Sequence, residues 1–172
     1  QAIWSPLVAQ ARANGNITAE IETRFSWEAF LVRDRSVNAF ALPGGYVGVH
    51  LGLIALTGSR DELAAVLAHE LSHVTQRHIA RGITNSKRQS LIGLAAMIIG
   101  VIAASRANST DGVAAVVTGG QAASIQGQLN FSRDMEREAD RIGFAVLTGA
   151  GFSPGGMAAM FEKLDQSSRL ND

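Results

Sequence analysis

Two histidines spaced four residues apart, with a glutamate directly after the first, stand in the stretch VLAHELSHVTQRH at residues 66–78. On an α-helix, positions four apart differ by about 40° and lie about 6 Å apart along the axis, so His69 and His73 present their imidazoles to one point. Glu70 lies about 100° round the helix from His69, near enough to touch a water on an ion held by the pair. The spacing therefore indicates a metal site with Glu70 as general base.

A catalytic zinc site needs a third protein ligand and an open fourth position. A third histidine ten residues after His69, as in the metzincins, is excluded because that position holds Ile79. His78 is expected to lie about 180° from His69 on the same helix, and so to point away from the pair with a surface or hydrogen-bonding role. The third ligand is then expected to be a carboxylate from a second helix.

That second helix is expected over residues 132–149, and it offers three carboxylates in the stretch EREAD. Its apolar positions define a core side, with Glu136 and Asp140 on one flank and Glu138 on the other, where a solvated face of ion pairs is expected. Glu136 is therefore the predicted ligand. Asp140, one turn further along, is placed to accept a hydrogen bond from the outer nitrogen of a ligand histidine. Acidic pairs of this spacing are common on helix surfaces, so this motif alone does not indicate a metal site. It indicates one because the same chain also contains HExxH.

The elements that position these residues can be predicted from their periodicity and turn residues. The histidine helix is expected to run from a cap at Ser59 to Gly82. Residues 24–54 contain β-rich runs separated by turn residues, which predicts a small antiparallel sheet. Further helices are expected before residue 15 and after residue 153. The predicted fold class is α+β, mainly helical, with the small sheet beside the HExxH helix.

Composition narrows the classes of partner and metal site. Fifteen basic residues balance fifteen acidic ones, so no strong field recruits nucleic acid or an anionic membrane. The chain has no cysteine, which excludes a disulfide scaffold and any thiolate zinc site. It opens QAIWSPLVAQ, without the basic start and apolar core of a signal peptide, so we expect a cytosolic protein or a trimmed mature one, and favour the second.

A Gly-, Ala- and Ser-rich insertion, residues 84–128, separates the two stretches that carry the predicted ligands. Its apolar run, residues 91–104, is shorter than the about twenty residues that a membrane-spanning helix needs, so no transmembrane span is expected. Because the insertion connects the two ligand helices, we expect it to lie across or beside the active site. It is interpreted either as a lid or as an additional helical pair packed on the core.

HExxH followed downstream by ExxxD is the signature of the gluzincin metallopeptidases. Three stretches, NAFALPGGYVGVHLGLI, ELAAVLAHELSHVTQRH and SRDMEREADRIGFAVL, resemble the gluzincin family of HtpX, the CAAX prenyl proteases and the BepA-type periplasmic proteases, and are closest to the last group. The resemblance covers roughly residues 24–165.

The resemblance implies a set of residue roles that agrees with the helical geometry. It implies one zinc ion per chain, held by His69, His73 and Glu136, with Glu70 activating the water and Asp140 supporting the site. It also implies that VNAFA is an edge strand over the cleft, on which an extended peptide docks by backbone hydrogen bonds. The substrate-binding candidates are therefore Asn38, Ala39 and Phe40.

The function implied by the resemblance is that of a zinc metalloendopeptidase cleaving misfolded or unassembled envelope proteins in the periplasm of a Gram-negative bacterium. Outer-membrane proteins and their assembly machinery are the implied partners. The alternative is a chaperone-like binding module that assists outer-membrane protein assembly with a latent protease site. BepA-type proteins carry a signal peptide and C-terminal helical repeats, so we expect residues 1–172 to be the metallopeptidase domain without these segments. A purely structural metal site is disfavoured because it would not need Glu70.

Overall fold

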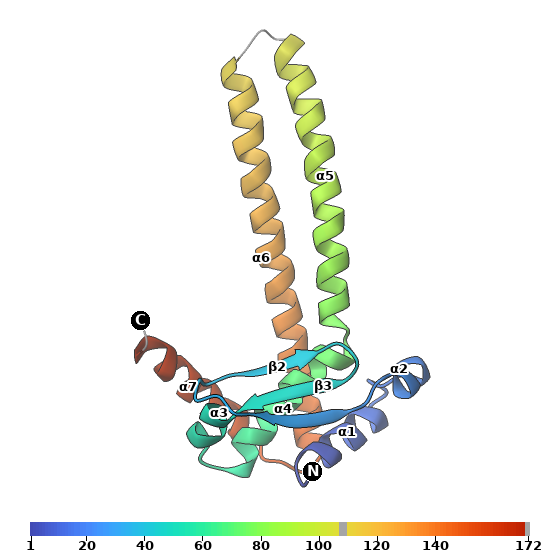
Figure 1. Cartoon of the computed structure of the whole chain (residues 1–172), viewed down its shortest axis with the longest axis vertical. Helices are drawn as coiled ribbons and strands as arrows, with labels where there is room; N and C mark the ends of the chain where they lie inside the picture. Colours follow the sequence, from blue (N-terminus) through green and yellow to red (C-terminus); the bar gives the residue numbers. More distant parts are fainter. Residues whose placement is uncertain (107–109, 171–172) are drawn as a thin grey trace. The chain divides into compact units, whose positions relative to one another are not determined.

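The computed structural model describes residues 1–106 and 110–170 of the chain. The chain divides into two compact units, one formed by Gln1–Ile79 with Arg137–Asp172 and the other by Ala80–Glu136. The described elements, in chain order, are α1 (Trp4–Ala13), α2 (Ala19–Arg24), β1 (Glu28–Val32), β2 (Ala39–Leu42), β3 (Tyr46–His50), α3 (Leu51–Leu56), α4 (Arg60–Thr75), α5 (His78–Arg106), α6 (Thr110–Gly149) and α7 (Gly155–Leu170) (Figure 1).

The first unit contains a three-stranded sheet with the order β1-β3-β2. β2 and β3 form an antiparallel hairpin, whereas β1 runs parallel to β3 on its other side. The predicted mainly helical α+β fold with a small sheet is confirmed, but the sheet is mixed rather than antiparallel. The reason is that residues 33–38 carry the chain from one edge of the sheet to the other, so β1 and β2 are not hairpin partners.

The turn between β2 and β3 is formed by the residues Pro43, Gly44 and Gly45. Gly44 and Gly45 both adopt positive φ, at 90° and 87°, which side chains other than glycine rarely tolerate. A Cβ on Gly45 would also lie 2.9 Å from the Cβ of Phe25. These two glycines therefore fix the register that aligns β2 with β3.

Helix α4 is the central element of the first unit. It contacts α1, α7, β2 and β3, and most of its side chains are buried. Leu67 and Leu71 belong to the same core cluster as Val47 and Val49 of β3. The histidines of HExxH consequently project from a helix that is held on several sides, which keeps their positions fixed.

The predicted start of α4 at Ser59 is confirmed. The Ser59 hydroxyl accepts a hydrogen bond of 3.2 Å from the backbone N–H of Glu62. The Glu62 carboxylate accepts hydrogen bonds from Lys163 of α7 and from the N–H of Gly58. The bond from Lys163 is the main cause, and that from Gly58 the second, of a pKa of Glu62 below the ordinary value. The same contact ties α4 to α7.

The predicted end of this helix at Gly82 is wrong. Helix α4 stops at Thr75, and α5 begins anew at His78 after a turn through Gln76 and Arg77. Arg77 has φ 55°, in the left-handed region that costs an L-residue about 1 kcal/mol or more. The change of direction moves His78 away from the position that a continuous helix would give it.

We expect Arg77→Gly to stabilise the protein. Glycine adopts the left-handed conformation without steric cost. The guanidinium group of Arg77 lies 3.8 Å from the Glu20 carboxylate, and an ion pair between two such exposed side chains contributes little. The unfolding free energy in urea is expected to rise by about 0.5–1 kcal/mol with an unchanged denaturant slope. A fall would mean that the guanidinium group stabilises the turn by more than its backbone strain costs.

The second unit consists of two helical segments, from α5 and α6, that run side by side (Figure 1). A Cβ on Gly127 would lie 3.1 Å from the side-chain amide of Gln89, so the segments approach closely there. Several large apolar side chains of α5 are exposed: Ile83, Leu91, Ile92, Leu94, Met97, Ile98, Ile99 and Ile102. Among the described residues, no helix is long and apolar enough to cross a bilayer.

Candidate metal centre

The two histidines of HExxH converge as their spacing predicts. The Nε2 atoms of His69 and His73 lie 3.0 Å apart. Two nitrogens bound to a tetrahedral zinc ion at the usual bond lengths lie about 3.3 Å apart, so a small movement would accommodate the ion. The inner nitrogens of both rings therefore face one point, as metal binding requires.

The outer nitrogen of His69 is held by Asp140. Its Nδ1 lies 2.9 Å from Asp140 Oδ1. An ionised carboxylate only accepts hydrogen bonds, so Nδ1 of His69 carries the proton and donates it, which leaves the lone pair on Nε2. A metal-binding histidine needs this tautomer, and the carboxylate also fixes the orientation of the ring.

Glycine at position 143 allows α6 to come close to α4 at this point. A Cβ on Gly143 would lie 3.1 Å from the backbone N of His69 and 3.2 Å from the carbonyl of Ala68. Gly143 follows Asp140 by three residues, so it lies on the same side of α6. The missing side chain thus lets the helix bring Asp140 within reach of His69.

The predicted third ligand, Glu136, lies one turn before Asp140 on α6. One potential ligand atom from each of His69, His73 and Glu136 can be chosen so that all three lie within 4.8 Å of one another. Two imidazoles and one carboxylate form a donor set typical of catalytic zinc, and they leave a position open for water or substrate. The residues present therefore fit the metal that the sequence pattern implies.

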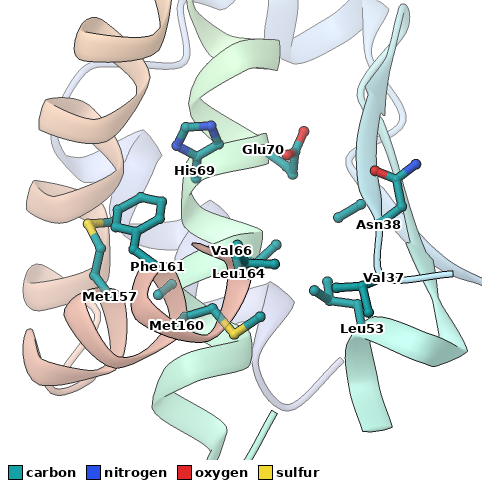
Figure 2. Close-up of a pocket in the computed structure, with 12 residues that line it drawn as sticks. Val37, Asn38, Leu53, Val66, His69, Glu70, Met157, Met160, Phe161 and Leu164 are labelled. Atoms are coloured by element: carbon teal, nitrogen blue, oxygen red, sulfur yellow. The ribbon is translucent and has the colours of Figure 1, made fainter. Parts of the chain in front are cut away.

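Glu70 lies beside a cavity of about 220 Å³ in the first unit. In Figure 2 its carboxylate lies between the His69 ring and Asn38. Apart from Asn38, His69 and Glu70, the lining is apolar and comes from α3, α4, α7 and the chain around β2: Val37, Ala39, Leu53, Ala65, Val66, Met157, Met160, Phe161 and Leu164. A carboxylate, an imidazole and an amide thus lie at the side of an otherwise apolar cavity.

The predicted substrate-binding residues are placed differently from one another. Asn38 and Ala39 line the cavity next to Glu70. Phe40 is absent from the lining and packs over β3 instead, where a Cβ on Gly48 would lie 2.3 Å from its ring. The Phe40 ring also makes an edge-on contact with His50.

His78 does not lie where the prediction of one continuous helix puts it. It is buried, with 3% of its surface exposed, rather than pointing away from the histidine pair. Its Nδ1 lies 2.8 Å from Nδ1 of His73, and its Nε2 lies 3.0 Å from Oε2 of Glu138. Glu138, expected on a solvated face, is thus a partner of this buried imidazole.

Burial lowers the pKa of His73 from 6.5 to about 4, with further lowering from the neighbouring charges of His69 and His78. The ring is therefore neutral near pH 7 and has a lone pair available for a metal ion.

The same pKa shift predicts a pH dependence of stability for the metal-free protein. Above pH 6.5, His73 is neutral in both the folded and the unfolded chain and has no effect. Between pH 6.5 and about 4, the unfolded chain takes up a proton that the folded protein resists, so folding stability falls as the pH falls.

We expect thermal melting in the presence of a chelator to show this fall, and His73→Gln to reduce the slope between pH 6.5 and about 4. Glutamine keeps a polar side chain but does not titrate. An equal slope in the variant would assign the pH dependence to other groups.

Known proteins with similar sequences identify the family. The family model described as peptidase family M48 matches residues 8–168. The chain is 37% identical over 170 residues to the beta-barrel assembly-enhancing protease of Yersinia pestis, covering 97% of this chain and 35% of the relative. It is 40% identical over 142 residues to the protein of the same name from Escherichia coli K12, covering 83% and 29%.

A eukaryotic relative also matches. The mitochondrial metalloendopeptidase OMA1 of Schizosaccharomyces pombe is 37% identical over 150 residues, which cover 81% of this chain and 38% of the relative. The chain thus spans about a third of the length of these curated relatives. Since the family model covers nearly the whole chain, the chain belongs to peptidase family M48.

Proposed function

We propose that this chain is the zinc metalloendopeptidase part of a protein that cleaves misfolded or unassembled envelope proteins. The observation that carries the proposal is the convergence of His69, His73 and Glu136, with Glu70 beside the histidine pair at an apolar cavity. A purely structural site would not need a carboxylate that faces a cavity.

The bound zinc ion would polarise the scissile carbonyl and make the attacking water more acidic. Glu70 is the general base: it accepts a proton from the water and passes it to the leaving amine. His69 and His73 hold the metal through Nε2, and Asp140 keeps His69 in the required tautomer. The reaction needs no covalent intermediate with the protein.

The edge of β2 is the proposed docking site for the substrate backbone. The N–H of His50 donates to the carbonyl of Asn38, and Ala39 is paired with Val49. In an antiparallel ladder, hydrogen-bonded and non-bonded pairs alternate, so the N–H and C=O of Ala39 face away from β3. They are available to an extended peptide, which β-strand addition would align beside Glu70.

The cavity beside Glu70 suggests a preference for large apolar side chains near the scissile bond. Its volume is about 220 Å³, and a cavity of about 150 Å³ already accommodates benzene. Unfolded and unassembled proteins expose such side chains. Taken with the names of the bacterial relatives, this supports unassembled outer-membrane proteins as substrates, the assembly machinery as partner, and the periplasm as location.

The test is hydrolysis of a disordered protein, casein, by the zinc-loaded chain. Cleavage is expected to disappear after treatment with a chelator and to return when zinc is added back. Activity that survives complete removal of metal would rule out the proposed mechanism.

A second candidate function is holding unfolded proteins without cleavage. The exposed apolar side chains of α5 favour it, because surfaces of this kind commonly bind other proteins. The Glu70→Gln variant would then suppress aggregation of an unfolded outer-membrane protein in a light-scattering assay. Replacement of Leu91, Ile92 and Ile99 by Gln is expected to abolish that suppression, and retained suppression would place the holding surface elsewhere.

We also propose, from the order of the segments, that the insertion at residues 84–128 restrains the protease as a lid. An apolar segment over the active site would limit unselective cleavage. Deletion of residues 91–104 is expected to raise casein cleavage sharply. Unchanged cleavage would leave the insertion without a restraining role.

A further inference from the structure

We propose that His78 and Glu138 are positioning residues that hold His73 in the tautomer and orientation that metal binding requires. The three side chains form a continuous series, from Glu138 Oε2 to His78 Nε2 at 3.0 Å and from His78 Nδ1 to His73 Nδ1 at 2.8 Å. This inference rests on the proposed metal site.

The direction of each hydrogen bond follows from the carboxylate. Glu138 in its ionised form only accepts, so Nε2 of His78 carries a proton and donates it. In a His78 ring that carries this one proton, Nδ1 is an acceptor, so Nδ1–H of His73 is the donor. The lone pair of His73 consequently resides on Nε2, the atom that faces Nε2 of His69.

Because His78 is buried, both of its ring nitrogens need hydrogen-bond partners from the protein. His78 is only 3% exposed, so water cannot replace a lost partner at either nitrogen. A buried polar group without a partner costs about 1–3 kcal/mol, which favours the one arrangement in which both nitrogens are bonded. A fixed His78 in turn restrains the ring of His73.

The backbone supplies a second, independent observation. The series exists because α4 stops at Thr75 and the chain turns through Arg77, which adopts φ 55°. Strained conformations of non-glycine residues persist where the surrounding structure demands them, and they cluster at functional sites. Here the strained turn places His78 against His73, which an uninterrupted helix would not do.

The two ligand histidines are thus held by parallel means. Asp140 binds the outer nitrogen of His69 directly. Glu138, two residues earlier and about 200° round α6, reaches the outer nitrogen of His73 through His78. Each ligand ring is therefore oriented by a carboxylate of the same helix.

The test is the zinc affinity of the purified chain, measured by competition with a chromogenic chelator. His78→Leu removes the acceptor for His73 and is expected to weaken zinc binding about 10–100-fold. His78→Gln supplies one acceptor and one donor, so it is expected to restore affinity to within about 3-fold of the wild type. Glu138→Ala removes the group that fixes the tautomer of His78, and it is expected to weaken zinc binding by less than His78→Leu does.

Ser72→Ala is the matched control. It removes a buried hydroxyl from the same helix, and that hydroxyl donates a hydrogen bond to the carbonyl of Ala68. Its zinc affinity is expected to equal that of the wild type. Melting of the metal-free variants measures their folding separately from metal binding.

The outcomes separate the two proposals. Failure of the wild type to bind zinc would overturn the proposed function. Normal zinc binding by His78→Leu, or equal losses in His78→Leu and His78→Gln, would overturn the positioning role alone. If His78→Leu does not fold, Glu138→Ala decides: the Glu138 side chain is 28% exposed, so its removal is tolerated more easily, and unchanged affinity would overturn the inference.

Discussion

Replacing Glu70 by Gln is expected to lower the rate of casein cleavage about 100- to 10,000-fold while zinc affinity stays within about 3-fold of the wild type. The amide has the shape of the carboxylate but cannot accept the proton of the attacking water. Zinc binding is expected to survive because the proposed ligands are His69, His73 and Glu136, whereas Glu70 lines the adjacent cavity. The measurement is the initial rate of hydrolysis by zinc-loaded protein, together with chelator competition.

Glu28→Gln is the control for the loss of one negative charge. Glu28 is an exposed residue of β1, in the same unit but outside the cavity, and its replacement is expected to leave the rate unchanged. Full cleavage by Glu70→Gln would assign the general base to another group. Loss of both cleavage and zinc binding would show that Glu70 is itself a ligand.

The histidine pair and its carboxylate neighbours could be predicted because they depend on local helical geometry. His69 and His73 converge for the same reason that any pair four apart shares a helix face. Asp140 meets His69 because its position on α6 follows from the apolar side of that helix. In both cases the relative positions of the residues are set by one regular helix, and the periodicity of such a helix can be recognised in the sequence.

The end of α4 could not be predicted in the same way. The turn at Gln76 and Arg77 contains neither glycine nor proline, so the residues that usually mark a helix end are missing. Arg77 adopts a left-handed conformation because tertiary contacts, including those of His78, outweigh its local preference. Because this helix end is not predicted, the sequence analysis puts His78 on the wrong side of the helix. For the same reason it does not identify Glu138 as a partner of His78.

The chain after β3 shows a second limit of pattern reading. The sequence pattern predicts β-rich runs up to residue 54, yet β3 ends at His50 and α3 begins at Leu51. A Cβ on Gly52 would lie 2.0 Å from the carbonyl oxygen of Arg35, so the connection from β1 packs directly against this glycine. A contact across such a separation in sequence leaves no trace in local periodicity.

Glu136→Ala is expected to weaken zinc binding by about 100-fold or more, beyond the 10- to 100-fold typical of losing a group that merely orients a ligand. The physical reason is the continuity of α6. Asp140 bonds His69 at 2.9 Å, and Glu136 lies one turn earlier, about 40° away and about 6 Å along the axis. A helix that places Asp140 at the outer nitrogen of His69 therefore presents Glu136 on nearly the same side, near the inner nitrogens.

Asp134→Ala is the matched control, because it removes a carboxylate two residues earlier on the same helix, from a position about 160° away from that of Glu136. Among the residues that the structure describes, Glu136 and not Asp134 joins His69 and His73 in the group of potential ligand atoms, so the control is expected to bind zinc as the wild type does. Equal losses in the two variants would indicate a general effect of negative charge on a cation. Unchanged affinity in Glu136→Ala would require a different third ligand, since two imidazoles alone do not complete a catalytic zinc site.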